Sequence, residues 1–172
     1  ADFRDRSNQV ANALNSLGLR KSDHVMIVMS RVPEWWESMI GMIKAGIVAV
    51  PGTTQLTEKD IRHRLEASHI KCVITDSDNP SKFDGAIKGL SGIDSLILVD
   101  GNREGWLNYE SIVSKAAKTI DAKDKVITHK DDPMLLYFTS GTTGNPKMTL
   151  HSHCYPIGHT VTGRFWLDLR PG

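Results

Sequence analysis

Residues 135–153 read LLYFTSGTTGNPKMTLHSH, and the way this stretch folds decides how the chain is interpreted. Leu135 to Phe138 favour a strand, and they lead into a loop of hydroxyl side chains and glycines that ends at Lys147. Residues 148–153 contain β-branched and alternating residues, which indicate a second strand. Glycines let backbone N–H groups turn towards one centre, and a lysine ammonium suits phosphate oxygens. The stretch therefore predicts a phosphate-binding loop at the tip of a hairpin.

Hydroxyl donors are concentrated in this loop, in addition to its backbone donors and its lysine. The predicted phosphate-binding residues are Thr139, Ser140, Gly141, Thr142, Thr143, Gly144, Asn145, Pro146 and Lys147. A hairpin loop that binds nothing is the alternative interpretation of the same spacing.

The loop departs from the Walker A pattern, G-x-x-x-x-G-K-[ST], at three points. Counted from Gly141, the second glycine should stand at position 146, where this chain has Pro146. Met148 stands where the pattern requires serine or threonine. The residues that follow favour a strand rather than a helix, so the sequence predicts a different class of phosphate loop.

The rest of the chain alternates short apolar strands with amphipathic helices, which predicts an α/β fold with a mainly parallel sheet and flanking helices. Strands are expected over 24–30, 47–52, 71–76 and 95–100, and helices over 3–17, 33–46, 57–68, 83–90 and 108–120. Pro33 marks a helix start, and Thr57 with Asp60 forms a cap-like opening to the third helix. A charged, solvated linker is expected over residues 121–130, and Asp131, Asp132 and Pro133 end the polar segment.

Composition excludes several classes of function. The chain of 172 residues carries 21 basic and 20 acidic side chains, a net charge of +1, so neither a nucleic-acid partner nor a charged membrane surface is indicated. No apolar run approaches the ~20 residues of a membrane span. Cys72 and Cys154 lack metal-ligand spacing and are expected to be reduced thiols in the cytoplasm, with the mitochondrial matrix as the alternative. The chain begins inside a helical pattern, which suggests a piece of a longer protein.

The stretch YFTSGTTGNPKM resembles the phosphate-binding signature of the adenylate-forming (AMP-binding) superfamily, which is rich in Ser and Thr, continues Gly-Thr-[Ser/Thr]-Gly and ends Pro-Lys. Within the superfamily, RVPEWW, KAGIVAVPGT and GWLNYESI are most similar to medium-chain acyl-CoA synthetases. The similarity is weakest between Asp76 and Ile93. It implies that residues 1–172 form part of the large N-terminal domain, without the C-terminal part of that domain or the small C-terminal domain.

The resemblance also implies a reaction with ATP, Mg²⁺ and coenzyme A. A carboxylic acid attacks the α-phosphate of ATP to give an acyl-adenylate and pyrophosphate, and coenzyme A then displaces AMP. Residues 139–144 would hold the β- and γ-phosphates, Lys147 would neutralise their charge, and Thr142 could approach the metal ion. No catalytic residue and no metal ligand of the family has a matching position here, so the chain alone is expected to be inactive.

Other features leave alternatives open. His151 and His153 would share a strand face with His159 nearby, which suits a metal site, the lining of an acyl or nucleotide pocket, or simple packing. Trp35 and Trp36 could form an acyl-binding surface, or one could pack in the core while the other is partly exposed. The basic helix IRHRLEAS, residues 61–68, could meet a coenzyme A phosphate or be plain exposed surface.

Three other functions also remain open from the sequence. They are an adenylating enzyme with another substrate such as an amino acid, a non-catalytic nucleotide- or phosphate-binding module, and an inert structural piece. The uncovered strand edges of a partial domain further predict self-association.

Overall fold

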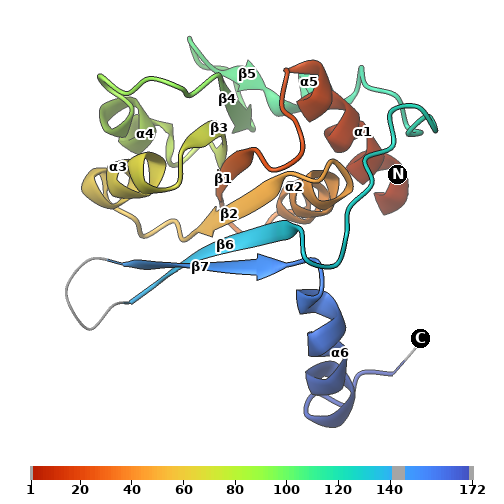
Figure 1. Ribbon diagram of the computed structural model, residues 1–172. Coiled ribbons are helices and arrows are strands. Elements are labelled where there is room, and N and C mark those ends of the chain that lie inside the picture. Colours follow the sequence, from red (N-terminus) through yellow and green to blue (C-terminus); the bar gives the residue numbers. More distant parts are fainter. Residues whose placement is uncertain (1, 141–145, 171–172) are drawn as a thin grey trace.

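The computed structural model describes residues 2–140 and 146–170 of the chain. Within these residues, seven strands form one sheet (Figure 1). Their order across the sheet is β5 (Leu107–Asn108), β4 (Ser95–Val99), β3 (Ile70–Asp76), β1 (His24–Val28), β2 (Val48–Gly52), β6 (Pro133–Thr139) and β7 (Lys147–Ser152). Neighbouring strands pair in parallel except for β6 and β7, which are antiparallel. The predicted α/β fold with a mainly parallel sheet is confirmed.

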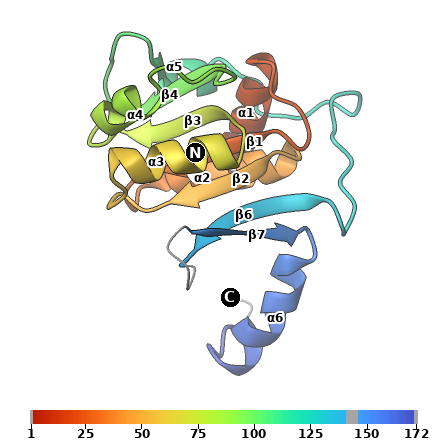
Figure 2. The same cartoon turned by 60° about the vertical axis from the view of Figure 1, so that its left-hand side comes forward.

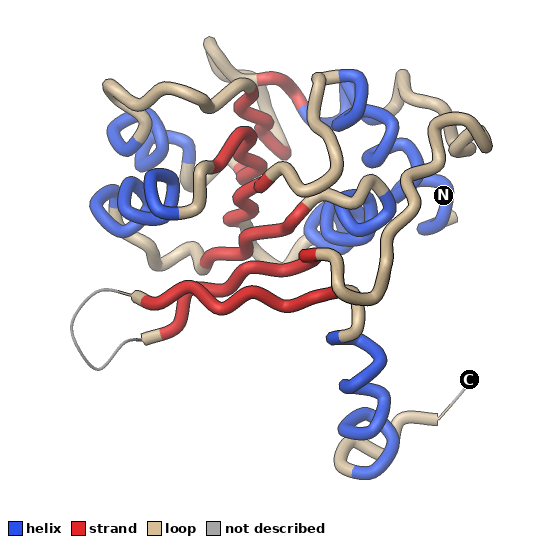
Figure 3. Tube along the Cα trace, in the orientation of Figure 1, coloured by secondary structure: helices blue, strands red, loops and turns tan. Residues whose placement is uncertain are grey.

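Helices cover both faces of the sheet, as the tube view shows (Figure 3). One face carries α1 (Phe3–Ser16), α2 (Pro33–Lys44) and α5 (Tyr109–Val113), and the other carries α3 (Glu58–Ala67) and α4 (Pro80–Ala86). The last helix, α6 (Tyr155–Phe165), extends away from the β7 edge (Figure 2). Strands covered on both faces bury side chains on both sides, and β1 and β3 are accordingly buried except at His24 and Lys71, near their starts.

The helix signals in the sequence correspond to observed caps. Pro33 occupies the first turn of α2, where its missing N–H leaves no intrahelical bond unmade. At the start of α3, the Thr57 hydroxyl accepts the Asp60 N–H at 3.3 Å, and the Asp60 carboxylate accepts the Thr57 N–H at 3.0 Å. This reciprocal pair is the capping box that the sequence predicts.

Helices α1 and α2 approach each other closely at Gly41. A Cβ atom at this position would lie 2.6 Å from Cβ and Cγ1 of Val10, closer than carbon atoms can pack. The glycine therefore fixes the spacing of the two helices that cover this face of β1 and β2.

The helix predicted over residues 108–120 is wrong beyond Val113. Side-chain amides of α1 bind the backbone carbonyls of the following segment instead. Gln9 donates to the carbonyls of residues 114 and 116 at 3.4 and 3.1 Å, Asn12 to those of 117 and 119 at 2.7 and 2.9 Å, and Asn8 to that of 118 at 2.8 Å. Carbonyls bound in this way are not available for helical hydrogen bonds, so the segment runs as a strap across α1.

Two smaller differences concern neighbouring elements. Helix α4 begins at Pro80, three residues before the predicted start at 83, because Pro80 provides the first turn that a proline favours. The two-residue strand β5 was not predicted, since its alternation is too short to be recognised.

The charged linker, residues 121–130, is largely exposed, as predicted, and the chain is held by hydrogen bonds and an ion pair just after it. The Asp132 carboxylate accepts the His129 N–H at 2.6 Å and lies 2.6 Å from Nζ of Lys21. These contacts fasten the chain beside the first residue of β6, and they set where the hairpin leaves the body of the fold.

Candidate functional site

The predicted phosphate loop lies at the tip of the β6–β7 hairpin, at the outer edge of the sheet (Figure 1). Six residue pairs join the two strands, from Pro133 opposite Ser152 to Thr139 opposite Lys147. A strand therefore follows the loop where a Walker A loop would be followed by a helix, and the predicted strand–loop–strand arrangement is confirmed.

Four of the nine predicted phosphate-binding residues belong to the described part of the chain: Thr139, Ser140, Pro146 and Lys147. Gly141, Thr142, Thr143, Gly144 and Asn145 lie outside the described residues. Phosphate binding by the whole set stays a prediction.

Thr139 and Lys147 form the mouth of the loop. They are directly opposite in the strand register, and the Thr139 hydroxyl donates to the Lys147 carbonyl at 3.4 Å. Both residues are exposed, and within residues 2–140 and 146–170 Lys147 has no carboxylate at ion-pair distance. An exposed ammonium without a carboxylate partner is free to meet an incoming anion.

The register also separates the two faces of the hairpin. Opposite residues of an antiparallel pair point to the same side, and successive residues alternate. Tyr137, Thr149 and His151 therefore share a face with the mouth residues, whereas Phe138 and Met148 point to the face that carries α3.

His151 belongs to an aromatic ladder that joins the hairpin to α6. Its ring centroid lies 5.7 Å from that of Tyr137 and 4.1 Å from that of Tyr155, and Tyr155 lies 4.4 Å from His159. Among the described residues, no group of three His, Cys, Asp or Glu side chains could hold a metal ion. The contacts of His151 correspond to the packing interpretation.

His153 lies just beyond β7, which ends at Ser152. Its backbone N–H donates to the Asp132 carbonyl at 3.1 Å, and its Nε2 is buried with no partner among the described residues. Burial lowers the pKa of the His153 imidazole, while the Asp132 carboxylate acts in the opposite direction. The residue closes the base of the hairpin, at the end opposite the loop.

A second possible ligand position lies between the carboxyl ends of β1 and β3, where a carboxylate of the chain itself makes the contacts. The connections leave these two strands in opposite directions, which makes this place the topological switch point where α/β sheets commonly bind ligands. Here the Asp76 carboxylate accepts the N–H and hydroxyl of Ser30 at 2.7 and 2.8 Å and the Asn79 amide at 2.6 Å. The sequence interpretation missed this cluster; an aspartate at the end of an apolar strand was the available signal.

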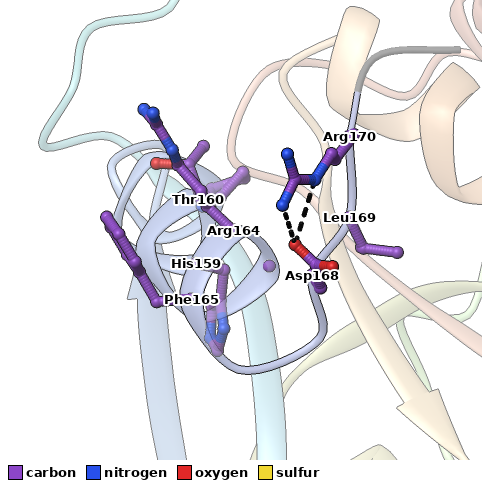
Figure 4. A pocket seen from close by; sticks show the side chains of 9 residues that line it. His159, Thr160, Arg164, Phe165, Asp168, Leu169 and Arg170 are labelled. Atoms are coloured by element: carbon purple, nitrogen blue, oxygen red, sulfur yellow. Dashed lines mark hydrogen bonds and ion pairs between the residues drawn. The ribbon is translucent and has the colours of Figure 1, made fainter.

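A sizeable open cavity lies away from the loop. It measures about 1090 Å³ and is formed by α6 and the turn after it (Figure 4). The Arg170 guanidinium donates to the Asp168 carboxylate at 2.9 and 3.1 Å along its edge. Because α6 leaves β7 at the end opposite the loop (Figure 1), this cavity is not part of the phosphate site.

The structure bears differently on the interpretations of the basic helix, residues 61–68, and of the tryptophan pair, Trp35 and Trp36. The side chains at positions 62–64 of this helix are half-buried, so the basic face is less exposed than the plain-surface interpretation expects. A contact with a coenzyme A phosphate stays a prediction. Arg62 donates to the carbonyls of residues 86 and 88 at 3.3 and 2.9 Å, and the side chains at positions 63 and 64 lie against the ring of Phe138. Trp36 is 59% exposed while Trp35 packs against the core, which is the arrangement predicted for two adjacent residues on one helix.

Comparison with known proteins identifies the family of the chain. A profile described as "AMP-binding enzyme" matches residues 1–169. The chain belongs to the AMP-binding enzyme family. This match confirms the resemblance of YFTSGTTGNPKM to the signature of the AMP-binding superfamily.

Among relatives of this AMP-binding chain is "Acyl-coenzyme A synthetase ACSM3, mitochondrial" of Mus musculus, 42% identical over 166 residues, which are 95% of this chain and 28% of that protein. The Homo sapiens protein of the same name is 40% identical over 168 residues, 96% of this chain and again 28% of the relative. The chain thus spans little more than a quarter of the length of these relatives.

Solved structures of CoA ligases and synthetases also resemble this chain. The anthranilate CoA ligase AuaEII, crystallised with anthranoyl-AMP, matches with a TM-score of 0.87 and 27% identity over 95% of this chain and 31% of the ligase. A Mycobacterium tuberculosis fatty acyl CoA synthetase matches with a TM-score of 0.75 and 27% identity over 89% of this chain and 28% of that protein. None of the helices in the described part of this AMP-binding chain is long and apolar enough to cross a membrane.

Proposed function

We propose that the chain is the N-terminal part of an ATP-dependent, AMP-forming acyl-CoA synthetase. In this reaction a fatty or related carboxylate attacks the α-phosphate of ATP, which releases pyrophosphate and leaves an acyl-adenylate. The thiol of coenzyme A then attacks the acyl carbon, AMP departs, and the thioester remains. The observation that carries the proposal is the hairpin with the loop signature, in a chain 42% identical to an acyl-coenzyme A synthetase.

The loop would act in the first step. Negative charge grows on the phosphoryl oxygens as pyrophosphate departs, and donors that are already oriented stabilise it without further reorganisation. Thr139 and Ser140, with residues 141–145, would cradle the β- and γ-phosphates. Lys147 would supply the positive charge, since its ammonium is exposed beside Thr139.

Mg²⁺ would bind together with the nucleotide, rather than at a site formed by protein ligands alone. A magnesium ion usually keeps several waters and is held by substrate phosphates with few protein oxygens. The hydroxyl of Thr142 is the proposed protein contact. We assign residues 1–172 to the N-terminal AMP-binding domain, and no residue among them as catalytic.

The compartment and the assembly are proposals as well. The two free thiols, Cys72 and Cys154, suit a reducing compartment, the cytoplasm or alternatively the mitochondrial matrix. Self-association is supported by exposed apolar side chains on β7, on α6 and at the C-cap of α6, namely Met148, Leu150, Ile157, Val161, Phe165 and Trp166. A monodisperse monomer in analytical ultracentrifugation would contradict the self-association.

Activity assays on two lengths of protein test the function. The 172-residue chain should form no acyl-CoA from ATP, coenzyme A and a panel of fatty acids. The complete gene product should form it and should also exchange labelled pyrophosphate into ATP only when a fatty or related carboxylic acid is present. Exchange driven by an amino acid instead would favour the amino-acid adenylating alternative, and Mg·ATP binding without any exchange would favour the non-catalytic module.

A further inference from the structure

Phe138 is the penultimate residue of β6 and points away from the mouth of the loop, towards α3. Two side chains of α3 meet its ring. Cζ of Arg64 lies 5.1 Å from the ring centroid, and the His63 ring approaches edge-on at 6.2 Å, with 69° between the planes. A guanidinium over an aromatic face at this distance makes a cation–π contact.

Arg64 is presented by a well-fixed helix. Ile61 and Leu65 anchor α3 in the core, and the capping box fixes its first turn. The guanidinium itself is held because Nη1 donates to the Asp60 carbonyl at 2.9 Å. The position of Arg64 is therefore set by α3 and does not depend on the hairpin.

The charge of Arg64 has few other partners. Burial lowers the pKa of Arg64, and the Asp60 carboxylate opposes this effect. Within the described residues no carboxylate lies at ion-pair distance from it, although its neighbour Arg62 pairs with Glu66 at 3.1 Å. The contact with the Phe138 ring therefore offsets much of the cost of removing the Arg64 charge from water.

The far half of β6 needs such support. The register between β2 and β6 contains one residue pair, Ala49 with Leu135, so the ladder to the body of the sheet stops before residues 136–139. Beyond that point the strand is paired only with β7, which is itself the outermost strand. Side-chain contacts of Leu136 and Phe138 then decide how this end lies against the body.

We propose that Arg64 is a positioning residue, whose contact with Phe138 holds the loop-bearing end of β6 against α3 and so sets the place of Thr139 and Lys147. Its consequence for phosphate binding rests on the proposed function. The contact itself is independent of any ligand and can be tested on the chain alone.

Hydrogen exchange of the ligand-free chain tests the contact. In Arg64→Met, amides of residues 137–139 and 147–149 should exchange roughly two- to fivefold faster. This is the acceleration expected when a cation–π contact of the strength found at exposed sites is lost. Amides of β1 and β3 should be unchanged. Arg64→Lys retains a cation and should restore part of the protection, and the exposed control Lys59→Met should have no effect.

A double-mutant cycle isolates the pair. Arg64→Met and Phe138→Leu should each speed exchange at the hairpin end, and together they should have less than the summed effect on a logarithmic scale. Additive effects, unchanged exchange in Arg64→Met, or an equal acceleration across all strands would overturn the proposal. The last result would mean that Arg64 stabilises the fold in general.

The functional consequence is measured separately, as the dissociation constant for Mg·ATP. If the unaltered chain binds Mg·ATP, Arg64→Met should weaken binding at least twofold, and an unchanged constant would overturn the role in placing the loop. If the unaltered chain does not bind, the phosphate role of the loop fails for this chain, while the exchange data still decide whether Arg64 holds β6. The two failures are therefore distinguishable.

Discussion

The carboxylate of Asp76 accepts two hydrogen bonds from Ser30, one from its N–H at 2.7 Å and one from its hydroxyl at 2.8 Å. Ser30 follows β1 and Asp76 ends β3, so the pair joins the carboxyl ends of the two strands. Many α/β proteins bind ligands at this place, and here a carboxylate of the chain itself accepts the hydrogen bonds. The N–H of Ser30 and the amide of Asn79 are therefore already bound at this edge, whereas Lys147 at the mouth of the hairpin loop has no carboxylate at ion-pair distance among the described residues.

Loss of this carboxylate should destabilise the chain. Asp76→Ala leaves the N–H of Ser30 and the amide of Asn79 without their acceptor, and we expect the free energy of unfolding to fall by about 1–3 kcal/mol. Urea denaturation followed by circular dichroism measures it. Asp124→Ala, an exposed aspartate in the linker, is the matched control and should change stability by less than about 0.5 kcal/mol. Equal effects of the two substitutions would contradict the role of Asp76.

Stability should also depend on pH through Asp76. Burial raises the pKa of this carboxyl group, but hydrogen bonds from Ser30 and Asn79 favour the ionised form, and the pKa lies below its ordinary value of 3.8. A group with a lowered pKa contributes stability above its ordinary pKa and loses it as the pH falls through the lowered value. The free energy of unfolding should therefore decline on acidification below about pH 4, and less steeply in Asp76→Ala. Parallel curves for the two proteins would refute this.

Gly41 should not tolerate a methyl group. Alanine favours a helix over glycine by about 1 kcal/mol, but at this position its Cβ would lie 2.6 Å from Val10, so we expect a net loss of about 1–3 kcal/mol. Gly158, in α6, has no atom within 4 Å of the same Cβ, and Gly158→Ala should be neutral or stabilising. Thermal melts of the two variants compare them directly. A stabilised Gly41→Ala would mean that α1 and α2 can separate at little cost.

The strap after α5 should depend on the side-chain amides of α1. Gln9 is 4% exposed and donates to two carbonyls of the strap, so Gln9→Ala should lower the free energy of unfolding by about 1–3 kcal/mol. Gln55→Ala removes an exposed glutamine in a turn and serves as the control. If urea midpoints of both variants match that of the unaltered chain, the strap is held by other contacts.

Local signals in the sequence were sufficient for most elements. The capping pair Thr57 and Asp60, the proline at position 33 and the apolar runs of β1 and β3 each act within a few residues, so their structural effect is visible in the sequence. The hairpin was predicted for the same reason, since Pro146 and Met148 exclude the Walker loop and the residues after them alternate.

Contacts between distant residues explain what the sequence did not reveal. The strap differs from a helix because amides more than 100 positions earlier bind its carbonyls. The cluster of Asp76 with Ser30 joins residues 46 positions apart. The half-burial of Arg64 likewise follows from the approach of β6, which no pattern within α3 could indicate.

Calorimetric titration with Mg·ATP and with magnesium pyrophosphate tests most directly whether the loop holds the terminal phosphates. The chain should bind both, and Lys147→Ala should weaken binding about tenfold or more, as loss of a charge-assisted contact of roughly 1.5–3 kcal/mol implies. Lys125→Ala, an exposed lysine in the linker, should leave both affinities unchanged. Absence of binding by the unaltered chain, or equal affinities in Lys147→Ala and Lys125→Ala, would contradict a phosphate-binding role for Lys147 in this chain.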